Sequence, residues 1–390
     1  MFRQSPGGKR IVAVVGLGQL LGWASSYYLV AVLGAPMAAG FGLPRVAVFA
    51  MFSAALLVSA LLGPFAGHQV DRYGGRRVLL ASNAVFAAAL LVMATAHSPV
   101  QLAAGWLLMG VAMPLGLYDA AFATVVRHFG SEARSSIVAV TLIAGFASSA
   151  SWPLSHFLES HHGWRSACLA WAALHLLVGA SLHGFGLPED SGLAMHHRNP
   201  AAPGATSAPG HPTLWLLMAI YAATGFVFAA LAAHLPRLLQ VAGCSPDAAI
   251  AAASLVGIFQ VAGRVAEAGY LKRLHPFVSA FIATTLHPVG AVLMLIFGAP
   301  AAMLFTALHG AGVGLMTIVK GTLPLALFGA AGFGRRAGLL EGPSKICQAI
   351  APIVFSLWLD AWGDGVLWIT GALTSAAFVG IWWLSRRADV

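Results

Sequence analysis

The sequence predicts an all-α polytopic membrane protein, with twelve transmembrane helices arranged as two pseudo-symmetric six-helix bundles. The first observation is composition: of 390 residues, 59% are hydrophobic and only 8% are charged, with a mean hydropathy of +0.83. A soluble domain carries about 25% charged residues. The second observation is a series of unbroken apolar runs of about twenty residues, the length needed to cross a bilayer. Twelve such runs occupy about 240–270 residues and leave room for short loops and one longer connection.

Apolar runs and the turn signals between them place the spans. The six in the first half are 11–33, 46–67, 78–96, 100–126, 135–158 and 166–187, and the six in the second half are 213–235, 247–270, 276–298, 301–328, 337–360 and 365–385. The stretch 188–212 is polar and rich in Pro, Gly and Ala, which is typical of a flexible cytoplasmic linker. We therefore expect an N-terminal bundle over 1–187, this linker, and a C-terminal bundle over 213–390.

The distribution of Lys and Arg predicts the orientation. If the N-terminus lies inside, the inner segments hold fifteen basic residues, whereas the outer loops hold only Arg45, Arg165 and Arg237. This positive-inside bias predicts that both termini are cytoplasmic. Short loops and an Ala-rich composition favour a bacterial inner (plasma) membrane. Three further basic residues lie within spans: Arg264, Lys320 and Lys345.

The two halves of the chain resemble each other at an offset of about 200 residues, as expected for a transporter built from repeats. Gly63 matches Gly263, and Asp119 in the fourth span matches Lys320 in the tenth. Paired halves of this kind place a central site near the middle of the membrane.

Other classes of protein are disfavoured. The net charge of +9 resides in loops beside spans, so it indicates no nucleic-acid partner. Three widely separated cysteines, and histidines without ligand spacing to a carboxylate, indicate neither a disulfide framework nor a metal site. We find no nucleophile–base pair and no ATP-binding segment, and therefore expect neither an enzyme nor a cofactor. The expected partners are the lipid bilayer and a small-molecule substrate, with the chain acting as a monomer.

One loop carries a recognisable motif. Between the second and third spans the chain reads Gly67-His68-Gln69-Val70-Asp71-Arg72-Tyr73-Gly74-Gly75-Arg76-Arg77. It resembles the signature loop of the major facilitator superfamily, G-x-x-x-D-R-x-G-x-R-R. A tight turn favours glycine, and arginines anchor it at the anionic leaflet. The sequence His162-Gly163-Trp164-Arg165 before the sixth span also resembles this superfamily.

The resemblance implies the two-bundle fold of that superfamily and transport by alternating access. It also implies that the motif forms a latch between conformations and does not touch substrate. The implied latch residues are Gly67, Asp71, Arg72, Gly74, Arg76 and Arg77. In the second half Leu271 stands where the first half has Asp71, so a strong latch is expected in the first half alone.

Ionisable residues inside spans are candidate functional residues, because an unpaired charge in lipid is costly. Arg264 in the eighth span together with Lys345 in the eleventh resembles the monocarboxylate porter and oxalate/formate antiporter branch. That resemblance implies that both cations hold a substrate carboxylate. Alternatively, Glu267 and Glu341 neutralise them, each on its own helix at spacings of i+3 and i−4.

Asp119 and Lys320 form a second candidate pair. They could meet across the two halves as a gate, or Asp119 could carry a coupling proton, since burial raises the pKa of a carboxyl group. An acid held neutral by burial, with no further role, is the third possibility.

Further residues are candidates for lining the substrate site. They are Tyr27, Tyr28, Tyr221 and His309, and helix packing is the competing explanation for each.

The sequence therefore predicts a secondary active transporter for a small, monocarboxylate-like organic anion, with proton coupling or exchange. Efflux of drug-like or amphipathic compounds is the alternative, followed by a transporter-like sensor.

Overall fold

The computed structural model describes residues 6–129, 133–189, 212–328 and 333–387. The chain separates into two compact units, Met1–His197 and Arg198–Val390, which are described separately below. Nearly all of the predicted linker 188–212 lies outside the described residues.

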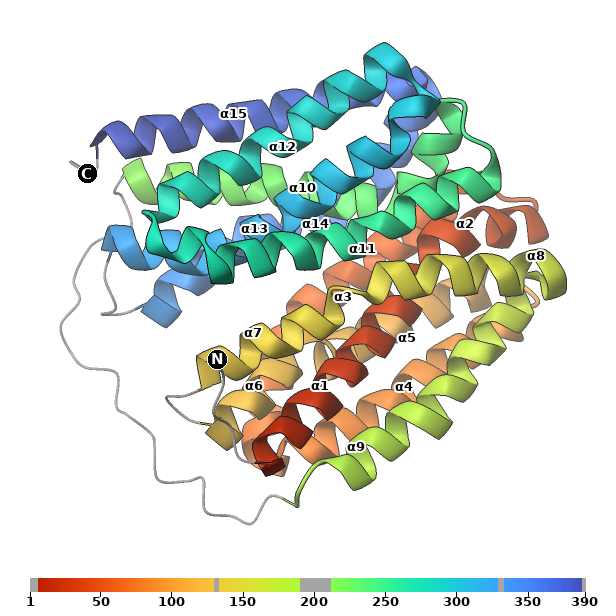
Figure 1. Ribbon diagram of the computed structural model, residues 1–390. Coiled ribbons are helices and arrows are strands. Elements are labelled where there is room, and N and C mark those ends of the chain that lie inside the picture. The colour runs from red at the N-terminus through yellow and green to blue at the C-terminus, as the bar shows by residue number, and fades with distance from the viewer. Residues whose placement is uncertain (1–5, 130–132, 190–211, 329–332, 388–390) are drawn as a thin grey trace. The chain divides into compact units, whose positions relative to one another are not determined.

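The described residues of both units are helical (Figure 1). The first unit contains α1 (Pro6–Ser25), α2 (Leu29–Gly40), α3 (Arg45–Tyr73), α4 (Gly75–Ala94), α5 (Pro99–Gly116), α6 (Tyr118–Phe129), α7 (Ala133–Ala144), α8 (Ala147–Leu174), a π-helical turn η2 (His175–Gly179) and α9 (Ala180–Gly186). The second contains α10 (Pro212–Val241), α11 (Pro246–Gly269), a short turn η4 (Leu271–Arg273), α12 (Pro276–Phe297), η5 (Ala299–Ala301), α13 (Ala302–Phe328), α14 (Phe333–Trp362), η6 (Gly363–Gly365) and α15 (Val366–Arg387).

Within the described ranges, ten stretches of helix are long and apolar enough to cross a membrane. Two of them, Ser135–Gly186 and Leu340–Arg387, are 52 and 48 residues long, and each covers two predicted spans. The first is interrupted at Gly163, whose φ of 79° lies outside the helical region, and the second at the turn η6. The predicted all-α polytopic membrane architecture is confirmed.

Three predicted spans of the first unit are each built from two shorter helices. The span 11–33 breaks between α1 and α2, where the Tyr28 amide donates to the Trp23 carbonyl, five residues back. The span 100–126 breaks at Leu117, three residues after Pro114, which has no amide hydrogen to donate to the helix. The span 135–158 breaks between α7 and α8. A break in a membrane-spanning helix leaves backbone carbonyls that need hydrogen-bond donors from elsewhere in the protein. At the break near Leu117, Gln19 Nε2 of α1 donates to the Gly116 carbonyl at 2.7 Å.

The internal repeat is visible in how glycines allow helices to approach each other. A Cβ atom on Gly110 of α5 would overlap the carbonyl oxygen of Ala55 in α3. In the second unit, a Cβ on Gly310 of α13 would overlap the carbonyl oxygen of Val256 in α11. These close contacts occupy matching positions about 200 residues apart, as expected for a repeated bundle with small residues at its helix interfaces.

Candidate functional site

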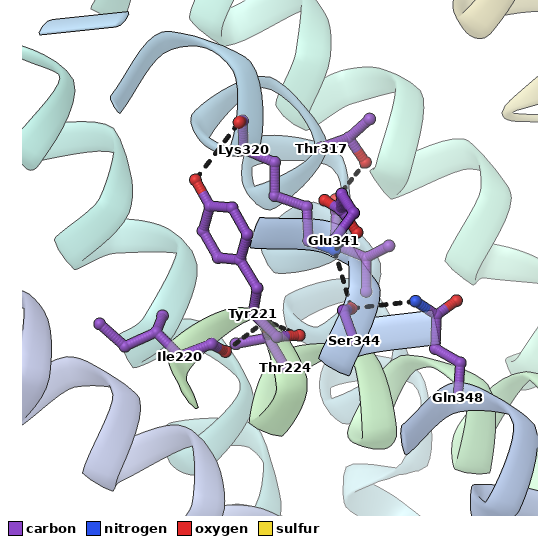
Figure 2. Close-up of polar contacts among 9 residues, drawn as sticks. Ile220, Tyr221, Thr224, Thr317, Lys320, Glu341, Ser344 and Gln348 are labelled. Carbon is purple, nitrogen blue, oxygen red and sulfur yellow. Dashed lines mark hydrogen bonds and ion pairs between the residues drawn. The ribbon is translucent and has the colours of Figure 1, made fainter. Parts of the chain in front are cut away.

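The second unit holds a polar cluster between α10, α13 and α14 (Figure 2). Lys320 of α13 directs its side chain toward α14. There its Nζ lies 3.1 Å from Glu341 Oε2 and 3.3 Å from Ser344 Oγ. Gln348 Nε2 donates to the same Ser344 oxygen at 3.0 Å. The side chains of Lys320 and Glu341 are 21% and 33% exposed, so the ion pair is partly accessible from outside the protein.

Tyr221 of α10 completes the surroundings of Lys320. The ammonium group lies 5.3 Å from the centre of the Tyr221 ring, within the range of a cation–π interaction. The Tyr221 hydroxyl donates to the main-chain oxygen of Lys320 at 3.3 Å. Gly225, one turn further along α10, allows the close packing, because a Cβ there would overlap Ser344 Oγ. Lys320 is thus held by side chains from two neighbouring helices.

Arg264 lies on α11 and is buried, with 3% of its surface exposed. Its Nη2 donates to Thr317 Oγ1 at 3.4 Å, and Thr317 precedes Lys320 by one turn of α13. Helices α11 and α13 approach closely at Gly314, where the side chain of any other residue would overlap the Gln260 carbonyl at its Cβ. Arg264 therefore contacts the same part of α13 that carries Lys320.

The two carboxylates considered as counter-ions, Glu267 and Glu341, each contact a neighbouring helix. Glu341 pairs with Lys320, a partner from another helix. Buried Glu267 accepts a hydrogen bond from Ser279 Oγ of α12 at 2.5 Å. Lys345 lies one turn after Glu341 and is exposed.

His309 is buried between α12 and α13, where its Nδ1 lies 3.0 Å from Nδ1 of His287. Its ring also stacks on Phe305, at a centroid distance of 6.2 Å. The structure thus places His309 in the packing between these two helices.

In the first unit, Tyr27 and Tyr28 lie at the break between α1 and α2 and are buried. Tyr27 packs on Phe52 at 5.5 Å and Tyr28 on Trp152 at 5.4 Å, both edge-on. Asp119 is exposed in the first turn of α6, where a negative charge favours the helix N-terminus.

The signature loop is a tight turn between α3 and α4. Gly74 adopts a φ of 83° and ψ of 154°, a conformation that favours glycine. Arg127 of α6 donates to the main-chain oxygen of Asp71 at 3.0 Å, and Arg76 pairs with Glu189 at 3.0 Å. Asp71, Arg72 and Arg77 are exposed, and Gly67 lies inside α3. The latch role of these residues stays a prediction.

A buried hydrogen-bonded network in the first unit was not anticipated. Ser25 Oγ lies 2.6 Å from His175 Nε2, His175 Nδ1 lies 3.0 Å from Asn83 Oδ1, and Asn83 Nδ2 lies 2.8 Å from His183 Nδ1. The available signal was the presence of Asn83, His175 and His183 in otherwise apolar spans, because buried polar groups in lipid need partners.

Comparison with known proteins places the chain in a family. The model of the Major Facilitator Superfamily matches residues 15–306. A gallate transporter of Pseudomonas putida is 27% identical over 267 residues, which cover 58% of this chain and 56% of that protein. The chain thus matches little more than half the length of this relative. With the family model covering most of its length, and with the apolar helices described above, the chain belongs to the Major Facilitator Superfamily and is a multi-pass membrane protein.

Proposed function

We propose that this protein is a secondary active transporter of a small organic anion, located in the inner membrane with both termini cytoplasmic. The observation that carries the proposal is the partly exposed ammonium of Lys320, which already binds the carboxylate of Glu341. A site that holds an internal carboxylate has the charge and hydrogen-bond donors to hold that of a substrate.

Two further features support an anionic substrate. Arg264 of α11 contacts Thr317, which lies one helical turn from Lys320 on α13. Its planar guanidinium suits two-point binding of a carboxylate. The gallate transporter is named for an aromatic carboxylate, and an aromatic ring, that of Tyr221, flanks Lys320 here. Membership of the superfamily supports alternating access driven by an ion or substrate gradient.

Thermal stabilisation of the purified protein by ligands tests this proposal. We would compare benzoate, gallate and aliphatic mono- and dicarboxylates with amphipathic cations. A ligand that binds only the folded state stabilises it by about 2.7 kcal/mol at a hundredfold excess over its Kd. We expect carboxylates to raise the melting temperature of the wild type.

Arg264→Gln should abolish this shift while leaving the unliganded protein folded. The matched control is Arg273→Gln, which removes an exposed arginine beyond the end of α11 and should retain the shift. Stabilisation by amphipathic cations alone would refute the anion proposal and favour efflux.

A further inference from the structure

We propose that Gln348 determines substrate specificity by accepting a hydrogen bond from a ring hydroxyl of the substrate. The substrate class is then a hydroxylated aromatic carboxylate, which binds Lys320 through its carboxylate and Gln348 through its hydroxyl. The inference rests on the proposed function and adds a second point of recognition to the same site. It narrows the small organic anion to one that carries a hydrogen-bond donor remote from its charge.

Gln348 and Lys320 lie at the two ends of one short chain of hydrogen bonds. Ser344 Oγ, between them, is 3.3 Å from Lys320 Nζ and 3.0 Å from Gln348 Nε2. Two hydrogen bonds in series therefore separate the ammonium group from the amide. A benzene ring with substituents at opposite ends has about this span, so one planar ligand can reach both groups.

The amide of Gln348 has an acceptor to spare. Its nitrogen donates to Ser344, and Figure 2 shows the amide oxygen turned away from that bond. Close packing restrains this orientation, because a Cβ on Gly225 of α10 would lie only 3.2 Å from Nε2. Within the part of the chain that the structure describes, no group donates to Oε1. A carbonyl oxygen accepts and cannot donate, so it selects a ligand that carries a donor.

The face of α14 on which Gln348 lies indicates that this oxygen is accessible to a substrate. Gln348 is half-buried near the middle of α14, and Glu341 lies on the same face two turns earlier. Ile346 and Ile350, two residues before and after it, are 59% and 41% exposed and lie on the opposite face. Those apolar side chains suit lipid, whereas lipid offers no partner to an amide. The accessible part of Gln348 therefore lies on the polar side of the helix.

A neutral acceptor at this position discriminates between ligands. A substrate hydroxyl that reaches Oε1 replaces a bond to water, whereas a ligand without a donor leaves the oxygen unpaired when it excludes water. A second carboxylate fits poorly, because an ionised carboxylate has only acceptors and would face the lone pairs of the amide oxygen. The geometry therefore favours a monocarboxylate with a ring hydroxyl over a dicarboxylate.

The test compares the Kd values of four ligands for the purified full-length protein, measured by titration calorimetry near neutral pH. They are benzoate, 4-hydroxybenzoate, 4-methoxybenzoate, which keeps the oxygen but has no proton to donate, and 2-hydroxybenzoate, whose hydroxyl lies beside its own carboxylate. The wild type should bind 4-hydroxybenzoate about three- to tenfold more tightly than benzoate, the contribution of one neutral hydrogen bond. The other two should bind no more tightly than benzoate.

Gln348→Leu removes the acceptor and should abolish the preference for 4-hydroxybenzoate over benzoate. Gln348→Met, which keeps the length and flexibility of the side chain, should do the same. The matched control is Gln240→Leu, which removes an exposed glutamine at the end of α10 and should keep the wild-type preference.

A wild-type preference that persists in either Gln348 variant would overturn the inference. Binding of 4-methoxybenzoate by the wild type as tightly as 4-hydroxybenzoate would overturn it as well, and this comparison decides the matter if neither variant folds. Failure of the wild type to bind any carboxylate would instead refute the proposed function.

Discussion

Removing the side chain of Asn83 should destabilise the first unit, because this residue joins three structural elements. Its Nδ2 donates to the Leu79 carbonyl of its own helix at 2.7 Å and lies 2.8 Å from His183 Nδ1. Because the bond to Leu79 sets the orientation of the amide, its Oδ1 accepts a hydrogen bond from His175 Nδ1 at 3.0 Å. His175 Nε2 is then free to accept from Ser25 Oγ, at 2.6 Å. One chain of hydrogen bonds therefore connects α1, α4, η2 and α9.

The magnitude follows from the bonds that are lost. Asn83→Ala removes two bonds to other segments, one to His175 and one to His183. A hydrogen bond between transmembrane helices contributes about 0.6 kcal/mol on average and about 1.7 kcal/mol at most. Leaving a buried donor without a partner costs about 1–3 kcal/mol in soluble proteins. Two interhelical bonds at these values give about 1.2–3.4 kcal/mol. One buried group left without a partner gives about 1–3 kcal/mol, so we expect a loss of about 1–3 kcal/mol in the free energy of unfolding.

The assay is denaturant-induced unfolding of the purified protein in mixed micelles, monitored by tryptophan fluorescence. Ser82→Ala is the matched control, because the buried Ser82 hydroxyl donates to the Leu79 carbonyl within its own helix. It should lose less than about 0.5 kcal/mol, below the average interhelical bond. An equal loss in the two variants, or additivity of Asn83→Ala with His183→Ala in a double-mutant cycle, would refute the reasoning.

Two further predictions concern glycines. Gly74→Ala should destabilise the protein by about 1–3 kcal/mol, because its φ of 83° and ψ of 154° suit glycine, whereas Gly67→Ala in the same motif, with open space around it, should be neutral or slightly stabilising. Equal melting temperatures for these two variants would contradict the strain argument. Gly110→Ala and Gly310→Ala should each cost about 1–3 kcal/mol, because their Cβ atoms would overlap a facing backbone carbonyl, whereas Gly321→Ala has open space and serves as the control. A marked loss in one half alone, measured by thermal unfolding, would count against a repeated packing contact.

The breaks within the predicted spans show where sequence reasoning reaches its limit. Hydropathy places 100–126 in the membrane as one segment, and the structure agrees on its position in the chain but interrupts it at Leu117. Pro114 is a visible signal, yet many spans tolerate proline inside a helix, as α10 does at Pro236. The outcome depends on whether another segment satisfies the freed backbone groups, and here Gln19 of α1 contributes.

Composition and spacing along the chain were enough to predict the membrane class, the positions of the spans, the signature turn and the presence of Arg264 and Lys320 inside spans. These features depend on local composition, on the length of apolar runs and on residue spacing along one segment. The contact of Glu341 with Lys320 and the contacts of Asn83 with two histidines became visible in the folded structure. Such partners lie on different helices. Their meeting depends on helix rotation and on close approach at positions such as Gly225, which no spacing within a single helix reveals.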